Sequence, residues 1–125
     1  MKALIFTILF VLPTSCYCGE WFPFSKDYKP LLNSNHFNES AVENLLWTHI
    51  TKNSDRDFEP KKFYNYQYQV LGNNIYKVNA FCNALGAANI SENYIVVDDG
   101  GSCYFEIEYN SSTKIFSKLY VNGEA

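Results

Sequence analysis

The stretch that decides the fold is YNYQYQVLGNNIYKVNAFC, residues 64–82. In its first half every second residue is aromatic or aliphatic, and these residues are Tyr64, Tyr66, Tyr68 and Val70. A period of two is typical of a strand with one buried face. The Gly72-Asn73-Asn74 run then predicts a tight turn, because Gly and Asn tolerate positive φ. Residues 76–82 alternate again, so the stretch predicts an antiparallel hairpin.

A second hairpin is predicted nearer the C-terminus. Its first strand alternates Cys103, Phe105, Ile107 and Tyr109 with polar residues, and its second strand carries Ile115, Ser117, Leu119 and Val121. Residues 110–113 form the turn between them. Earlier, an apolar run at 94–97 precedes Asp98-Asp99-Gly100-Gly101, which we interpret as a hairpin turn. The alternative, a calcium loop, would need a ligand spacing that does not follow this motif.

One helix is predicted ahead of the first hairpin. Ser40 and Glu43 have the spacing of a capping box. Residues on one face then recur at helical spacing, and these are Val42, Leu45, Leu46, His49 and Ile50. The polar stretch 51–60 ends the helix. We interpret His49 as a packed core residue on this face rather than as a ligand.

These elements predict an α+β fold, in which one helix packs on a four- to five-stranded antiparallel sheet. Residues 20–37 show no period, and we interpret them as an extended N-terminal segment anchored by Trp21, Phe22 and Phe24. The exposed edge strands expected of an open sheet are compatible with a monomer or with a swapped dimer.

The first 18 residues are typical of a secretory signal peptide. One positive charge at Lys2 is followed by a short apolar run that Pro13 ends. Cys16 and Cys18 occupy the small positions before a cut that leaves Gly19 first. The expected organisation is therefore a signal peptide at 1–18 and a single domain at 19–125, secreted to the extracellular space, or to the periplasm of a bacterium. The alternative is a lipoprotein cut that leaves Cys16 lipidated.

Export decides how the remaining cysteines and several asparagines are interpreted. Cys82 and Cys103 are an even pair in an exported chain, which predicts one disulfide. N-glycosylation sequons begin at Asn38, Asn89 and Asn110, and a eukaryotic secretory pathway would treat them as glycan acceptors. The sequence does not identify the source, so glycan occupancy stays open.

The composition and the motifs of the sequence argue against nucleic-acid binding, catalysis and cofactor binding. The net charge of −3 and the lack of a basic stripe argue against a nucleic-acid partner. A nucleophile needs a base beside it, but the two domain cysteines are expected to be paired, and only His36 and His49 could serve as imidazole bases. Zinc spacing and phosphate-binding glycine patterns are absent from the sequence. We expect no enzyme activity, no cofactor, no metal and no membrane in the mature form.

A resemblance to a known family lies in the first hairpin. Residues 69–78, QVLGNNIYKV, resemble the cystatin pattern Q-x-V-x-G followed by x-N-Y-[FY]-x-x-V. Val70, Gly72, Asn74 and Tyr76 are in register with the Val, Gly, Asn and aromatic residue of that pattern, and Val78 comes one residue early. Residues 103–107, CYFEI, are similar to the C-x-F-x-I of secreted cystatins. The likeness spans Ser40 to Val121.

The resemblance implies a protein partner, a papain-type cysteine protease, whose active-site cleft is occluded by a wedge. The protease-binding residues would be Val70, Leu71, Gly72, Asn73 and Asn74 of the first hairpin, together with Gly19 of the N-terminal segment. A later hairpin, which carries Pro-Trp in the family, completes the wedge.

The chain departs from the family pattern at several positions. Tyr68 stands where the register requires Gln, and residues 110–113 contain neither Pro nor Trp. Two cysteines also cannot form the two bridges of secreted cystatins. Two functions therefore follow from the sequence. One is a secreted inhibitor of papain-type cysteine proteases, and the other is a non-inhibitory secreted binding or structural module on the same scaffold.

Overall fold

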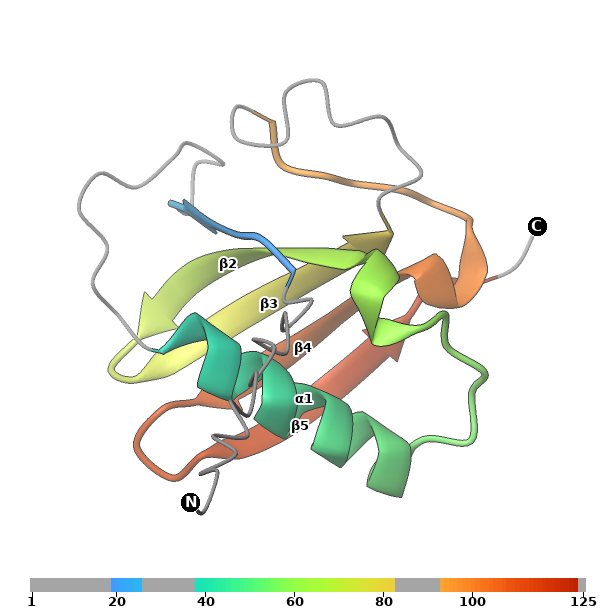
Figure 1. The fold of residues 1–125 in the computed structure, drawn as a ribbon. Helices are drawn as coiled ribbons and strands as arrows, with labels where there is room; N and C mark the ends of the chain where they lie inside the picture. The colour runs from blue at the N-terminus through green and yellow to red at the C-terminus, as the bar shows by residue number, and fades with distance from the viewer. Residues whose placement is uncertain (1–18, 26–37, 83–92, 124–125) are drawn as a thin grey trace, which may run out of the picture.

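The computed structural model describes residues 19–25, 38–82 and 93–123. The predicted signal peptide, His36 and the sequon at Asn89 lie outside the described residues. One open sheet and one helix make up the fold, which is therefore α+β (Figure 1). The sheet order is β1-β2-β3-β4-β5, and the strands are β1 Trp21–Phe24, β2 Tyr64–Gly72, β3 Ile75–Cys82, β4 Tyr104–Asn110 and β5 Ile115–Val121. The helix α1, Glu39–Asn53, lies across one face of the sheet.

The N-cap residue of the helix lies two residues before the predicted one. Asn38, and not Ser40, is the N-cap residue, because its Oδ1 accepts a hydrogen bond of 3.1 Å from the main-chain nitrogen of Ala41. The predicted capping box is therefore wrong. Val42, Leu46 and Ile50 are buried against the sheet, as their spacing predicts. Leu45 is 38% exposed, so the apolar face is narrower than expected.

His49 packs at the side of this helix. Its ring lies 5.5 Å from that of Phe116 in β5, measured between centroids. His49 therefore packs against β5, but it is only half-buried and does not belong to the core, so the predicted core position is wrong.

Both predicted hairpins are present and antiparallel. The pairs Tyr68↔Val78 and Tyr109↔Phe116 show that each strand faces the partner expected from the sequence. The expectation of a wholly antiparallel sheet is wrong, because β1 pairs with β2 in parallel, with Trp21 opposite Tyr66. The chain leaves β1, passes through the helix and re-enters the sheet at β2, and a crossover of this kind joins parallel strands. Residues 21–24 of the segment interpreted as extended thus form an edge strand of a mixed sheet, and residues 26–37 lie outside the described residues.

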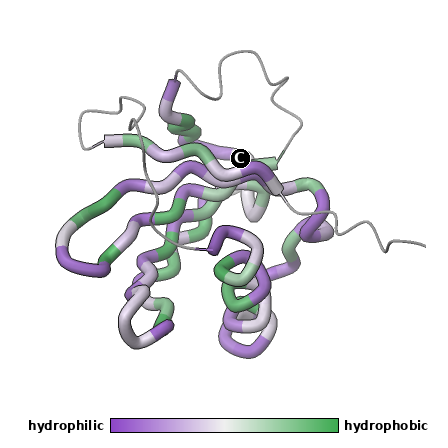
Figure 2. The backbone as a smooth tube through the Cα atoms, turned by 60° about the vertical axis from the view of Figure 1, so that its left-hand side comes forward, coloured by the Kyte–Doolittle hydropathy of each residue, from purple (hydrophilic) through white to green (hydrophobic). Residues whose placement is uncertain are grey.

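Tyrosine and phenylalanine fill the space between sheet and helix. The rings of Tyr64, Tyr66 and Phe105 are at most 1% exposed. Trp47 of the helix lies against Tyr64 and donates a hydrogen bond of 2.7 Å from Nε1 to the hydroxyl of Tyr66. Figure 2 shows hydrophobic and hydrophilic residues succeeding one another along the strands that carry this core. The abundant aromatic residues therefore serve largely as core.

The opposite face of β2 and β3 is also covered, although one buried face was expected. Gln67 and Asn79 lie there, 0% and 6% exposed. The carboxamide of Gln67 donates to the main-chain oxygen of Asn93 and accepts from the main-chain nitrogen of Ile95, over 2.7 and 2.8 Å. Asn79 donates to the oxygen of Ile95 over 2.8 Å. These amides hold Asn93 and Ile95 against the sheet, so polar residues at alternate positions do not mark a solvated face here.

The Asp98–Gly101 motif does not form the expected hairpin turn, because residues 94–97 are not a strand. Gly100 instead has a φ of +101° and leads into a short 3-10 turn, η3, Gly101–Cys103. An added Cβ at Gly100 would lie 2.3 Å from the ring of Tyr104. Glycine is required at this position both by its φ and by the ring beside it.

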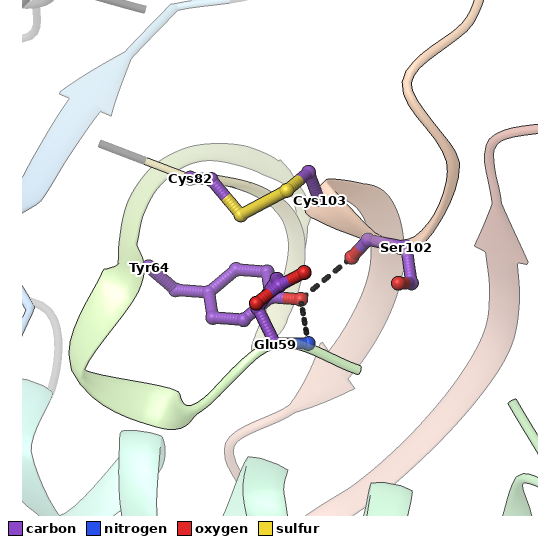
Figure 3. The surroundings of a disulfide bond; sticks show 5 residues. All are labelled: Glu59, Tyr64, Cys82, Ser102 and Cys103. Atoms are coloured by element: carbon purple, nitrogen blue, oxygen red, sulfur yellow. Dashed lines mark hydrogen bonds between the residues drawn. A yellow bond between two sulfur atoms is a disulfide. The ribbon is translucent and has the colours of Figure 1, made fainter. Parts of the chain in front are cut away.

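The predicted disulfide between Cys82 and Cys103 is present, with a Cα–Cα distance of 5.1 Å (Figure 3). It joins the end of β3 to η3, which leads into β4. Beside it, the hydroxyl of Tyr64 accepts a hydrogen bond of 3.2 Å from the main-chain nitrogen of Glu59. The bridge thus closes the end of the sheet opposite the two hairpin turns.

Candidate functional site

The first part of the candidate site is the turn between β2 and β3. Strand pairing slips between Val70 and Gly72, which places a bulge just before the turn. Asn74 completes the turn with a φ of +60°. Gly72, Asn73 and Asn74 are exposed, while Val70 and Leu71 are half-buried. The turn therefore offers main-chain groups and amide side chains at its tip and an apolar base.

The second part is the turn between β4 and β5. The side-chain Oδ1 of Asn110 accepts hydrogen bonds from the main-chain nitrogens of Ser112 and Thr113, over 2.9 and 3.1 Å. Lys114 ends this turn with a φ of +58°. These bonds fix the turn from within, so its shape is set before any partner arrives.

The two turns are joined directly. The main-chain nitrogen of Ser111 donates to the main-chain oxygen of Asn74 over 2.8 Å, and the Ser111 hydroxyl lies 3.3 Å from the same oxygen. Both turns lie on the left of the sheet in Figure 1. We call residues 70–74 and 111–114 the two-hairpin edge. Its exposed side chains are amides, hydroxyls and the ammonium of Lys114, which suit contact with another macromolecule.

Gly19 is not part of this edge. Because β1 is parallel to β2 and Trp21 lies opposite Tyr66, Gly19 lies at the level of Tyr64. The turn at Gly72 is eight residues further along β2, or roughly 26 Å at ~3.3 Å per residue. The structure therefore brings together the hairpin residues named from the sequence and places Gly19 at the other end of the strand.

Glu43 is a buried ionisable residue that sequence reasoning did not single out beyond the capping box. Its side chain is 0% exposed, and its Oε2 accepts a hydrogen bond of 2.9 Å from the main-chain nitrogen of Gly19. Its Oε1 lies 3.4 Å from Nζ of Lys61. Its place among Val42, Leu46 and Ile50 on the helix could have indicated burial, but nothing local indicates Gly19 as its partner.

Two carboxylates of β4, Glu106 and Glu108, form ion pairs with separate lysines. Glu106 lies 3.1 Å from Lys77, and Glu108 lies 3.1 Å from Lys118. Such partly exposed pairs contribute little to stability, at about 0–1 kcal/mol each. Their arrangement is that of surface ion pairs along the sheet.

The sequons that fall on described residues occupy two different places. Asn38 is exposed at the start of the helix, where Oδ1 is used as the cap. Asn110 is half-buried and belongs to the second turn. A glycan on Asn110 would stand beside the two-hairpin edge, whereas one on Asn38 would stand at the helix.

Within residues 19–25, 38–82 and 93–123, neither a metal site nor a membrane-spanning helix is present. There, no group of three or more His, Cys, Asp or Glu side chains could hold a metal ion. No helix among those residues is long and apolar enough to cross a membrane. A hollow of about 210 Å³ lies on the outer face between Asn79, Glu106 and Tyr120. The side-chain amide of Asn79 in this hollow already donates a hydrogen bond to the main-chain oxygen of Ile95.

Comparison of the chain with family models, with curated proteins and with solved structures finds no match. The resemblance to cystatins accordingly rests on the residues quoted above.

Proposed function

We propose that this protein is a secreted, non-enzymatic inhibitor that binds a papain-type cysteine protease through the two-hairpin edge and occludes its active-site cleft. The observation that carries the proposal is the hydrogen bond between Ser111 and Asn74, which unites the two turns into one preformed projection. A projection that is rigid before binding loses little conformational entropy in the complex. The Cys82–Cys103 bridge and the lack of a spanning helix among the described residues are compatible with an extracellular location.

Gly72 lies at the centre of this proposal. It is exposed at the tip, and an added Cβ would meet no atom of the described chain within 4 Å. A small residue is thus not demanded by the fold at this position. In the proposed complex, glycine lets the main chain of the turn approach the floor of the cleft closely.

A second candidate function is a binding module that does not inhibit proteases. The position of Gly19 favours it, because Gly19 lies at the far end of β2 and does not contribute to an occluding wedge at the two-hairpin edge. The sequon at Asn110 also favours it, since a glycan there would hinder entry of the edge into a narrow cleft. In this case the same edge contacts a flatter protein surface.

The test is titration of papain with the protein purified from the medium of secreting cells, with residual protease activity as the readout. The informative variant is Gly72→Arg, and the matched control is Gly123→Arg. Gly123 is also exposed and open around its Cβ, but it lies beyond β5 near η3, away from the edge. Circular dichroism establishes that both variants fold.

The inhibitor proposal expects stoichiometric inhibition by the wild-type protein and by Gly123→Arg. Gly72→Arg is expected to raise the inhibition constant at least about tenfold, which corresponds to about 1.4 kcal/mol. Absence of inhibition at micromolar protein, both with glycans and after the sequon is removed by Ser112→Ala, would overturn it. The non-inhibitory module would then lead.

A further inference from the structure

The main-chain nitrogen of Gly19 points at a buried carboxylate. It donates a hydrogen bond of 2.9 Å to Oε2 of Glu43, across 24 positions of sequence. The Glu43 side chain is 0% exposed. Removing a carboxylate from water is costly unless it gains both charge and hydrogen-bond partners. The site therefore favours a cation in the place where the Gly19 nitrogen lies.

Lys61, the cation beside the Glu43 carboxylate, compensates the charge of that carboxylate only in part. Nζ of Lys61 lies 3.4 Å from Oε1 and at the same time donates a hydrogen bond of 2.6 Å to Oδ1 of Asn44. The Lys61 side chain is 31% exposed, so water partly screens its charge. Among the described residues Oε1 has no hydrogen-bond partner. A positive charge on the Gly19 nitrogen, which donates directly to Oε2, would therefore add to the stabilisation that Lys61 supplies only in part.

The space around Gly19 admits only a glycine. An added Cβ would lie 2.2 Å from the main-chain oxygen of Tyr64, 2.7 Å from the ring of Tyr66 and 3.0 Å from Oε2 of Glu43. A main-chain oxygen cannot move away as the end of a flexible side chain can. Any other residue here would displace the nitrogen from the carboxylate.

The chain that follows is held in register. The main-chain nitrogen of Glu20 donates to Oδ1 of Asn65 over 2.8 Å, and its oxygen accepts from the nitrogen of Tyr66 over 2.9 Å. Trp21 then stacks on Tyr66, with ring centroids 4.2 Å apart. The position of the Gly19 nitrogen is thus held by the pairing of β1 with β2.

We propose that Gly19 is the first residue of the mature protein and that its free α-ammonium forms an ion pair with Glu43 in this pocket. The sequence before it ends in the small residues expected ahead of a signal-peptidase cut, Cys16 and Cys18. Hydrolysis of the Cys18–Gly19 bond consumes one water, leaves a carboxylate on Cys18 and frees the Gly19 amine. That amine takes up a proton, because an α-amino group has a pKa of about 7.7–8.0.

Processing then changes the bond without moving the atom. In the precursor, the Gly19 nitrogen is a neutral donor with one hydrogen. In the processed chain, the same nitrogen carries a positive charge and three hydrogens, and it faces Oε2 at hydrogen-bond distance. Removal of the signal peptide thereby attaches β1 to α1 more firmly, and this holds whatever the two-hairpin edge binds.

The first experiment compares two processed chains from secreting cells. One is the natural protein, and the other has an alanine inserted between Cys18 and Gly19, which moves the ammonium one residue outward. Intact mass identifies the first residue of each. We expect Gly19 as the natural start and a melting temperature about 5 °C lower for the extended chain. In a Glu43→Gln background the insertion should change the melting temperature by much less.

Three results would overturn the inference: a natural start other than Gly19, no destabilisation on insertion, or an equal destabilisation in both backgrounds. A second readout does not require Glu43→Gln to fold. At pH 7 an acylating reagent should modify the α-amine of the natural chain about tenfold more slowly than that of the extended chain. The reason is that the ion pair between Gly19 and Glu43 must break before the amine can react. Equal rates would also contradict the ion pair.

Discussion

The hydroxyl of Tyr64 donates a hydrogen bond of 2.7 Å to the main-chain oxygen of Ser102, beside the disulfide that links β3 to η3 (Figure 3). The same hydroxyl accepts a hydrogen bond from the main-chain nitrogen of Glu59. One side chain of β2 thus connects the segment after the helix to the segment before β4. The stability of this end of the sheet should depend on that phenol.

Replacement of Tyr64 by Phe should therefore destabilise the protein. The change leaves two main-chain groups, the oxygen of Ser102 and the nitrogen of Glu59, without their partner, at a cost of about 1–3 kcal/mol. The loss in the free energy of unfolding is measured by urea denaturation. The control is Tyr120→Phe, because Tyr120 is 64% exposed and should change the free energy of unfolding by less than about 0.5 kcal/mol. Equal effects of the two changes would contradict the assigned role.

Alkaline pH should weaken the fold through the same residue. Burial raises the pKa of Tyr64 from 10.0 to about 12, and burial also raises the pKa of Tyr66 and of Tyr109. Above pH 10 the unfolded chain loses these phenol protons while the folded chain keeps them, so the free energy of unfolding falls as pH rises. The contribution of Tyr64 is complete below pH 10 and is lost by about pH 12. Unfolding measured between pH 8 and 11 should show the decline, with a shallower slope in Tyr64→Phe.

Loss of the disulfide should also be costly. The bridge joins residues separated by 21 positions, and the chain-entropy model assigns about 3 kcal/mol to a loop of that size. The double variant Cys82→Ala, Cys103→Ala should show this loss in urea unfolding. A reducing agent should reproduce it in the wild-type protein and should leave the double variant unchanged. A reducing agent without effect on the wild-type protein would argue that the bridge does not form.

The N-cap can be tested separately from glycosylation. Asn38→Ala removes the bond to the nitrogen of Ala41 and should destabilise the protein by about 1 kcal/mol. Asn38→Asp keeps a capping oxygen and should stay within a few tenths of a kcal/mol of the wild type. Both variants lack the sequon, so a difference between their melting temperatures is caused by the loss of the capping hydrogen bond. No difference would mean that the helix does not depend on Asn38.

Strand β1 should be held mainly by Trp21. Its ring is 8% exposed and stacks on Tyr66 with an interplanar angle of 20°. Trp21→Ala should lower the free energy of unfolding by about 3–5 kcal/mol. Phe22→Ala is the matched control, because Phe22 is only half-buried and should cost much less. Hydrogen exchange of the β2 amides facing β1 provides a local readout, and unchanged protection in Trp21→Ala would contradict this assignment.

Local patterns accounted for the elements whose information lies within a few neighbouring residues. The period of two in 64–70 and 103–109 and the Gly72–Asn74 turn predicted both hairpins, because a strand and a tight turn are specified by adjacent positions. The helix was predicted for the same reason, although its cap was misplaced. Two residues with suitable side chains, Asn38 and Ser40, compete for that role, and local sequence does not choose between them.

The sequence by itself therefore determined the helix, the two hairpins and the pairing of Cys82 with Cys103. Only the tertiary structure decided the parallel direction of β1, the cover over Gln67 and Asn79, and the separation of Gly19 from the two-hairpin edge. The physical reason is that each of these depends on contacts between residues far apart in the chain. Glu43 and Gly19 are 24 positions apart. No periodicity or motif in the sequence indicates that the main-chain nitrogen of Gly19 donates a hydrogen bond to the buried Glu43 carboxylate.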